Sequence, residues 1–387
     1  MTASAPQIVS EVAAAVGLAE GEAGVGDVVR AVARFEPVAV RKVSRATELP
    51  VPIVSAICNE LRKRGVVSPQ RPVQLTAQGR DLFDSARVRL PVDAACPTCA
   101  QREIVVPDSL AAVARKLAAA EVAAPPTRLD LDQAHCTVET KIRRVLVMHE
   151  EGALDGKRVL LLGDDDLTSL AIKLVADHTG VGAAIRELVV VDVDPAVVSF
   201  LRRTLRRAPF RVECVVHDLR VPLPERLRGS ADTVFTDPPY TSEGAALFLS
   251  RAAEAADGRS RADVFLAFGP RRPEVALAVQ RAIAEMGLIV RRLVRNFNDY
   301  LGAGALGGTS HLYQLATTSA LHPLVPGRYQ GPLYTGDHRE PVRSYRCKRC
   351  ARTQRVGRGQ MWLSVDTLRG DGCPRCGGTA FVPLPRG

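Results

Sequence analysis

The stretch that decides the fold is Arg158-Val-Leu-Leu-Leu-Gly163-Asp164-Asp165-Asp166-Leu167, an apolar run that ends in one glycine and three carboxylates. A continuous apolar run of this length is typical of a buried strand. Such runs alternate with helix-like segments from residue 154 to residue 322, which predicts an α/β domain with a parallel sheet covered by helices on both faces. Ligands of such sheets bind at the carboxyl ends of the strands, where these aspartates lie.

The loop after this strand is unsuited to a phosphate group. A dinucleotide-binding loop contains several glycines that let the backbone approach a pyrophosphate, whereas Gly163 is followed by three acids that would repel it. We therefore expect a cationic ligand, such as the sulfonium of an S-adenosyl compound or a protonated polyamine. One aspartate would be enough to cap the next helix, but three adjacent carboxylates raise one another's pKa unless a cation compensates them.

Three further strand ends carry candidate ligand-binding residues. Asp192, with Asp194 as the alternative, follows the second strand and is predicted to accept hydrogen bonds from both ribose hydroxyls. Asp218 follows the third strand, where a carboxylate can accept from an adenine amine. The fourth strand ends in Asp237-Pro-Pro-Tyr-Thr241, whose prolines stiffen the turn. Acceptors beside an aromatic ring can hold an amine and direct its lone pair at an electrophilic carbon.

These motifs together resemble the branched-chain polyamine synthase family, the N4-bis(aminopropyl)spermidine synthases. The resemblance rests on the Gly-Asp-Asp-Asp-Leu and Asp-Pro-Pro-Tyr-Thr motifs and on Leu131-Asp-Gln133 and Glu139-Thr140 before the first strand, and it covers roughly residues 28–320. It implies a class I methyltransferase-like, Rossmann-type domain over residues 154–322. It also implies transfer of aminopropyl groups from decarboxylated S-adenosylmethionine to a secondary amine of a polyamine, with release of methylthioadenosine and without a catalytic metal.

The resemblance and the positions in the motifs suggest a role for each residue. Asp166 is expected to accept the amine proton, with Asp237 as the second catalytic carboxylate. The residues expected to bind the polyamine are Asp164, Asp165, Glu139, Tyr240 and Thr241. Those expected to bind the S-adenosyl cosubstrate are Gly163, Asp192, Asp194, Asp218 and Pro238.

The sequence before this domain predicts three segments. Residues 1–27 are typical of a flexible leader, 28–90 of a winged helix-turn-helix, and 91–153 of a linker region that contains Cys96-Pro-Thr-Cys99. A winged helix indicates either DNA binding or a dimerisation or substrate-covering domain, and it favours a homodimer. The lone cysteine pair supplies only two of the four ligands that structural zinc needs. The sequence does not select among His135, Cys136 and the tail pairs as further ligands, or between a zinc site and a redox-idle pair, so we make no catalytic claim for it.

The C-terminal segment, residues 323–387, is basic and carries two cysteine pairs, Cys347-Lys-Arg-Cys350 and Cys373-Pro-Arg-Cys376. Paired knuckles at this spacing predict a zinc ribbon in which all four cysteines bind one structural Zn²⁺. The segment contains twelve Lys and Arg against four Asp and Glu, a formal +8 of the chain's +10. The rest of the chain is therefore close to neutral, and the tail leaves a nucleic-acid partner open.

Length and composition exclude several classes of protein. A chain of 387 residues with 46% hydrophobic and 24% charged residues is typical of a soluble protein of two or three domains. No apolar run reaches the ~20 residues that span a bilayer, and the first residues do not resemble a signal peptide. We expect a cytoplasmic protein without a membrane partner, in which cysteine pairs favour metal binding over disulfides.

Two other functions agree with part of the pattern. An S-adenosylmethionine-dependent amino-methyltransferase acting on DNA or RNA shares the Asp-Pro-Pro-Tyr motif, and the ribbon and basic tail would suit it. Such an enzyme needs a basic groove beside the turn, and the three aspartates and the near-neutral core argue against one. A winged-helix regulator with a degenerate transferase fold would bind DNA without turnover.

Overall fold

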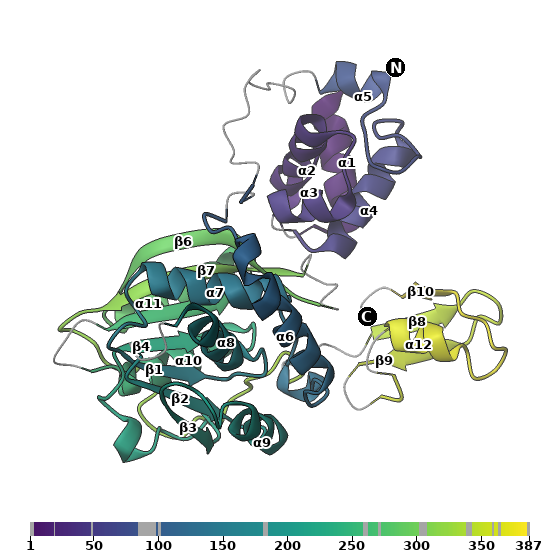
Figure 1. Cartoon of the computed structure of the whole chain (residues 1–387). Helices are drawn as coiled ribbons and strands as arrows, with labels where there is room; N and C mark the ends of the chain where they lie inside the picture. Colours follow the sequence, from purple (N-terminus) through teal and green to yellow (C-terminus); the bar gives the residue numbers. More distant parts are fainter. Residues whose placement is uncertain are drawn as a thin grey trace. The chain divides into compact units, whose positions relative to one another are not determined.

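The computed structural model (Figure 1) describes residues 4–384 apart from 19, 48, 84–97, 100–101, 181–184, 258–261, 270–271, 302–307, 338–342, 358–359 and 363–364. The chain divides into two compact units. The first, which we call the main unit, comprises residues 1–129 and 133–330. The second, the ribbon unit, comprises residues 130–132 and 331–387. Cys96, of the lone cysteine pair, lies outside the described residues.

The main unit contains a seven-stranded sheet in the order β3-β2-β1-β4-β5-β7-β6. β7 runs antiparallel to both of its neighbours and the remaining pairs are parallel, so the predicted α/β class is confirmed and the prediction of an entirely parallel sheet is not. The strands are β1 (Arg158–Leu162), β2 (Glu187–Asp192), β3 (Arg211–Val216), β4 (Thr233–Thr236), β5 (Asp263–Phe268), β6 (Leu288–Asp299) and β7 (Thr309–Thr317).

Helices cover both faces of this sheet (Figure 1), as its apolar central strands require. Val159 and Leu161 of β1 pack into one core with helices α6 to α9, while α10 contacts β1 and β4 and packs with α11. The helices are α6 (Ala111–Val122), α7 (Val138–Glu150), α8 (Thr168–Thr179), α9 (Pro195–Thr204), α10 (Ser242–Ala255) and α11 (Pro273–Glu285). Among the described residues, none of the helices combines the length and apolar character needed to cross a bilayer.

The linker predicted for residues 91–153 is wrong for much of its length. α6 and α7 both lie in this range, and Leu117 and Ile142 are fully buried in the core they share with the sheet. The two helices precede the first strand. The alternation of strands and helices that predicted the domain from residue 154 onward therefore did not include them.

The flexible leader predicted for residues 1–27 is also wrong. Two helices, α1 (Ala5–Val16) and α2 (Gly21–Phe35), begin in this range, and Ile8 and Val12 are buried in the N-terminal core. Their spacing of four residues is that of one helix face. The alanine- and glycine-rich composition of the segment concealed this stripe.

Three more helices complete the N-terminal region. An antiparallel bridge joins Val67 to Leu75, within the range predicted to form a winged helix-turn-helix. The helices are α3 (Val40–Thr47), α4 (Val51–Lys63) and α5 (Ala77–Leu82). The assignment of this region as a winged helix stays a prediction.

The basic tail begins later than the predicted residue 323. Residues 323–330 belong to the main unit, where the fully buried guanidinium of Arg251 on α10 donates to the carbonyl oxygens of Val325 and Gly327 at 2.8 Å each. The ribbon unit has its own sheet in the order β10-β8-β9. Its elements are β8 (Arg343–Cys347), β9 (Thr353–Val356), α12 (Val365–Asp371) and β10 (Phe381–Pro383).

The start of α10 holds the Asp-Pro-Pro-Tyr turn in shape. Thr241 caps the helix, since its Oγ1 accepts a hydrogen bond from the N–H of Gly244 at 2.8 Å. A Cβ atom at Gly244 would lie 2.4 Å from the carbonyl oxygen of Pro239. The turn therefore reaches its place only because residue 244 lacks a side chain.

We expect Gly244→Ala to displace the turn and to destabilise the protein by about 1–3 kcal/mol, the usual cost of an overpacked site. Thermal unfolding and the turnover number of the purified protein measure the two effects. Gly327→Ala is the matched control, because a Cβ there has no neighbour within 4 Å. Equal behaviour of the two variants would contradict the prediction.

Candidate active site

The acidic loop and the Asp-Pro-Pro-Tyr turn meet at the carboxyl edge of the sheet. β1 and β4 are adjacent parallel strands, and Leu162 pairs with Thr236 at their ends. β2 lies on the other side of β1 and brings Asp192 to the same edge. Three loops that are far apart in the chain therefore face one another.

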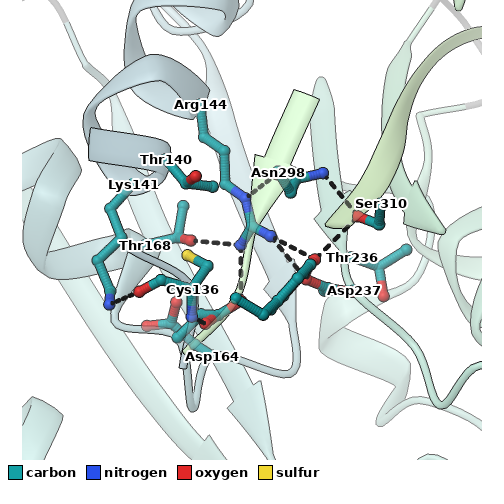
Figure 2. A network of polar contacts seen from close by, with 12 residues as sticks. Cys136, Thr140, Lys141, Arg144, Asp164, Thr168, Thr236, Asp237, Asn298 and Ser310 are labelled. Carbon is teal, nitrogen blue, oxygen red and sulfur yellow. Dashed lines mark hydrogen bonds and ion pairs between the residues drawn. The ribbon is translucent and has the colours of Figure 1, made fainter. Parts of the chain in front are cut away.

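One buried arginine joins two of these loops. The side chain of Arg144, on α7, has 0% exposure and lies at the centre of the network in Figure 2. Its Nη1 donates to Oδ2 of Asp166 at 2.8 Å, its Nη2 to Oδ2 of Asp237 at 2.6 Å, and its Nε to Oδ1 of Asn298 at 2.8 Å. A buried charge is tolerated only when it is paired and hydrogen-bonded. Arg144 thus ties the acidic loop to the Asp-Pro-Pro-Tyr turn.

Aromatic and hydroxyl side chains surround Asp237 on its other side. The phenol of Tyr300 donates to Oδ2 of Asp237 at 2.6 Å and lies 3.0 Å from Oγ of Ser310. The ring of Tyr240 is edge-on to that of Tyr300, with centroids 6.1 Å apart, and 5.5 Å from that of Phe268. The turn therefore combines a carboxylate with an aromatic wall, the pair of features that binds and desolvates an amine.

The two carboxylates that Arg144 holds have opposite pKa shifts. Burial raises the pKa of Asp237 to about 7, and Arg144 offsets only part of this effect. Burial also acts on Asp166, but Arg144, Lys141 and the backbone N–H of Cys136 outweigh it and lower the pKa of that carboxyl. At neutral pH, Asp166 is therefore ionised and a weak proton acceptor, whereas Asp237 gains and loses a proton readily.

The other two aspartates of the acidic loop lie in different surroundings. Asp164 is buried and accepts hydrogen bonds from the backbone N–H of Ser169 at 3.1 Å and from its hydroxyl, and burial raises its pKa to about 8. Asp165 is half-buried. Burial and then the neighbouring carboxylates, Asp166 foremost, raise its pKa well above the usual range. A bound cation would return such a group to its ionised form.

Several residues predicted to bind a nucleoside also hold the loops at this edge. Gly163 follows β1 with a φ of 79°, in the left-handed region that favours glycine. The carboxylate of Asp192 accepts from the N–H groups of Asp164 at 2.9 Å and of Asp194 at 2.7 Å. Asp194 in turn caps α9.

The remaining predicted residues lie outside the network around Arg144. Glu139 is on α7, but its side chain is 61% exposed and pairs with Arg143. Thr241 is the cap of α10, and Pro238 is buried in the turn. Asp218 follows β3, with its side chain 43% exposed.

Sequence reasoning missed Arg144, Asn298 and Tyr300. A signal for the first was present in the run Lys141-Ile-Arg-Arg144 of α7, where three cations occur in a helix with many apolar residues. All three cations are at most 1% exposed. Asn298 and Tyr300 had no comparable signal, because polar residues near the end of an edge strand are ordinary.

The ribbon unit brings the four tail cysteines together. Their Sγ atoms all lie within 4.8 Å of one another, and the Cys347–Cys376 and Cys350–Cys373 pairs are each separated by 3.6 Å. Four sulfurs bound tetrahedrally at about 2.3 Å from one zinc ion are about 3.8 Å apart. The arrangement of the cysteines is therefore compatible with zinc.

A family model and three known proteins are similar to this chain. The model described as the branched-chain polyamine synthase A C-terminal domain matches residues 113–319, a range that includes Arg144 and all of its partners. An uncharacterized protein of Methanocaldococcus jannaschii is 30% identical, and the alignment covers 98% of this chain and 93% of that protein. An N(4)-bis(aminopropyl)spermidine synthase of the same organism is also 30% identical, over 68% of this chain and 74% of its own length.

A solved structure shares the fold. The branched-chain polyamine synthase of Thermus thermophilus, in complex with N4-aminopropylspermidine and 5′-methylthioadenosine, superposes with a TM-score of 0.66 at 27% identity. The match covers 84% of this chain and 96% of the other.

We expect Arg144→Lys to lower the turnover number at least about tenfold, because an ammonium group cannot hold both carboxylates in the planar fork geometry and a small misplacement of catalytic groups is costly. Steady-state kinetics with purified protein measure the change. Arg251→Lys is the control. Arg251 on α10 is equally buried, but it pairs with Glu254 and donates to the backbone carbonyl oxygens of residues 325 and 327 instead of the site carboxylates. A loss of activity in Arg251→Lys as large as that in Arg144→Lys would show that the effect is general destabilisation.

Proposed function

The chain belongs to the branched-chain polyamine synthase family, and we propose that it transfers aminopropyl groups from decarboxylated S-adenosylmethionine to a secondary amine of a polyamine. Two features of the same sheet edge carry this proposal. In the acidic loop, burial and the neighbouring carboxyl groups raise the pKa of Asp165 well above its usual range, and at the turn burial raises the pKa of Asp237 to about 7. The ligands of the Thermus thermophilus structure, an aminopropylated spermidine and methylthioadenosine, are the two products of such a transfer.

The reaction needs a neutral amine beside the sulfonium compound. The nitrogen lone pair attacks the methylene carbon next to the sulfur, the carbon–sulfur bond breaks, and methylthioadenosine leaves with the electron pair. The nitrogen must lose its proton to a group on the protein. We assign this role to Asp237 in place of Asp166, because Asp166 is held ionised by Arg144 and has a lowered pKa.

The other acids then have distinct roles. Asp166 positions Arg144 and, through it, Asp237. Asp165, with Asp164 behind it, supplies negative charge to the ammonium groups of the polyamine. The ring of Tyr240 forms a wall of the amine site. A hydrogen-bond network of this kind holds the acceptor before substrate arrives, so little reorganisation accompanies the reaction.

The cosubstrate residues keep their predicted roles in this proposal. Asp192 and Gly163 lie at the ends of β2 and β1, where the ribose of a nucleoside binds in sheets of this type. Asp194 and Pro238 support the same loops, and Asp218 follows β3, where it would accept from the adenine amine.

The ribbon unit is proposed to bind one structural zinc ion through Cys347, Cys350, Cys373 and Cys376. Among the described residues the core around it is small. It contains Val356, Trp362, Leu368, Phe381 and the cysteines, too little apolar surface to fold securely without a metal. The zinc would take no part in the transfer. A homodimer and a cytoplasmic location remain predictions from the sequence.

The test of the function is mass spectrometry of spermidine incubated with decarboxylated S-adenosylmethionine and purified protein. We expect a mass gain of one or two aminopropyl units. A methyl group added to DNA or RNA from S-adenosylmethionine, without any gain on spermidine, would overturn the proposal.

The pH dependence of the turnover number tests the role of Asp237. Only its ionised form accepts a proton, so the turnover number should fall as the pH drops below about 7, where Asp237 becomes protonated. Asp237→Asn should lose turnover but still bind methylthioadenosine. Asp263→Asn, at the opposite end of the sheet, is the control. A turnover number that stays flat down to the ordinary range of a carboxyl pKa would return the role to Asp166.

Metal analysis of the purified chain tests the ribbon. We expect about one zinc ion per chain, and almost none in Cys347→Ser, because three ligands do not close a structural site. Cys214→Ser, which removes a buried cysteine of β3, should keep its zinc. Unchanged zinc in Cys347→Ser would exclude the four-cysteine site.

A further inference from the structure

The sheet of the ribbon unit has one buried and one exposed face. β8 and β9 pair antiparallel with Arg346 opposite Thr353 and Ser344 opposite Arg355. Side chains of directly opposite residues share a face of the sheet. These four residues therefore project from one face, which we call the outer ribbon face. Tyr345, Cys347, Gln354, Val356 and Phe381 occupy the inner face, toward the core.

The outer ribbon face belongs to a strongly basic surface. Residues 331–387 contain eleven Lys and Arg against four Asp and Glu, a formal +7. Four thiolates and one zinc ion would lower this by about two units and leave it clearly positive. The described basic residues of this segment, all exposed, are Arg343, Arg346, Lys348, Arg349, Arg352, Arg355, Arg369 and Arg375.

The three described acids of this segment have partners away from the outer ribbon face. Asp366 pairs with Arg369 on α12, and Asp371 accepts from the indole N–H of Trp362. Asp337 accepts from two backbone N–H groups. The register of the sheet places no acid on the outer ribbon face among the described residues. The positive charge of this face is therefore available to an anionic partner.

The shape and chemistry of the face favour double-stranded RNA among polyanions. Single strands are held by exposed aromatic rings, but Trp362 and Phe381 are buried. A single helix or a two-stranded β-ribbon fits the major groove of DNA, whereas α12 has only seven residues and the sheet of this face has three strands. Duplex RNA is instead recognised through phosphates and 2′-hydroxyls across a shallow groove. Arg346 and Arg355 suit the phosphates, while Ser344 and Thr353 lie between them as hydroxyl partners.

The comparisons separate the ribbon from the family's shared domain. The family model ends at residue 319, before the ribbon begins. The uncharacterized Methanocaldococcus jannaschii protein aligns over 98% of this chain, so its alignment must run through most of the ribbon, whereas the synthase of the same organism aligns over 68%. The ribbon therefore lies outside the domain that the family model describes.

We propose that the outer ribbon face binds the phosphate backbone of double-stranded RNA, through Arg346 and Arg355 with Ser344 and Thr353. Binding of this kind is independent of base sequence and weakens with salt, because each phosphate contact releases counterions. It concerns the ribbon alone and holds whichever group the main unit transfers.

The test measures binding of the full-length protein to a 20-base-pair RNA duplex, by fluorescence anisotropy over a series of salt concentrations. The double variant Arg346→Gln/Arg355→Gln should bind about tenfold or more weakly, and the slope of log K against log salt should fall by about two. Arg206→Gln/Arg207→Gln removes the same charge from exposed positions of the main unit and should bind as the unchanged protein does. Transfer to free spermidine should be equal in all three proteins.

Three results would overturn the proposal. One is absence of RNA binding at low salt by protein that retains its zinc. The second is an equal loss of binding in both double variants, which would reduce the effect to net charge. The third is tighter binding to a DNA duplex of the same sequence, to single-stranded RNA or to anionic vesicles. Zinc content, measured in each variant, shows that the ribbon has folded.

Discussion

The buried guanidinium of Arg144 is the interaction on which the site depends. One cation lies between two carboxylates, and both of them belong to loops whose acids would otherwise repel one another. Arg144 also donates to Asn298 of β6. This hydrogen bond connects the network to the edge strand of the sheet, which pairs with the antiparallel β7. α7 therefore acts as a part of the site itself, because its buried Arg144 fixes the distance between the acidic loop and the turn.

The shared cation also makes two aspartates chemically different. Asp166 receives Arg144, a backbone N–H and the nearby Lys141, and its ionised form is stabilised. Asp237 is also buried, but Arg144 and the Tyr300 hydroxyl offset only part of the effect of burial, and its pKa rises to about 7. The proposed transfer uses both conditions: the charge of Asp166 orders the site, and Asp237, with a pKa near the operating pH, accepts the amine proton. The loop after β1 adds further carboxylates at a position where nucleotide-binding sheets have glycines, and we propose that they bind the polycation.

The ribbon unit has only a small hydrophobic core. Its few buried side chains provide little hydrophobic stabilisation. Its four cysteines, whose sulfurs lie within 4.8 Å of one another, are compatible with a zinc ion that would add to this stabilisation. Because the inner face of its sheet is used for this core, the outer face is free to carry charge. The main unit, in contrast, has a large apolar core, and its buried Arg144 is paired with Asp166 and Asp237.

The sequence by itself determined the α/β class, the acidic edge of the sheet and the cysteine cluster, since each depends on a local pattern: apolar runs, residues directly after a strand, or the spacing of cysteines. It misjudged residues 1–27, where the alanine-, glycine- and valine-rich composition of the helices concealed their apolar stripe. It also misjudged residues 91–153, whose helices precede the first strand and so lie outside the strand–helix alternation. Only the tertiary structure decided that the pKa of Asp166 is lowered and that of Asp237 is raised. Arg144 lies 22 residues from Asp166 and 93 from Asp237, and a pKa depends on burial and on distances that no local pattern contains.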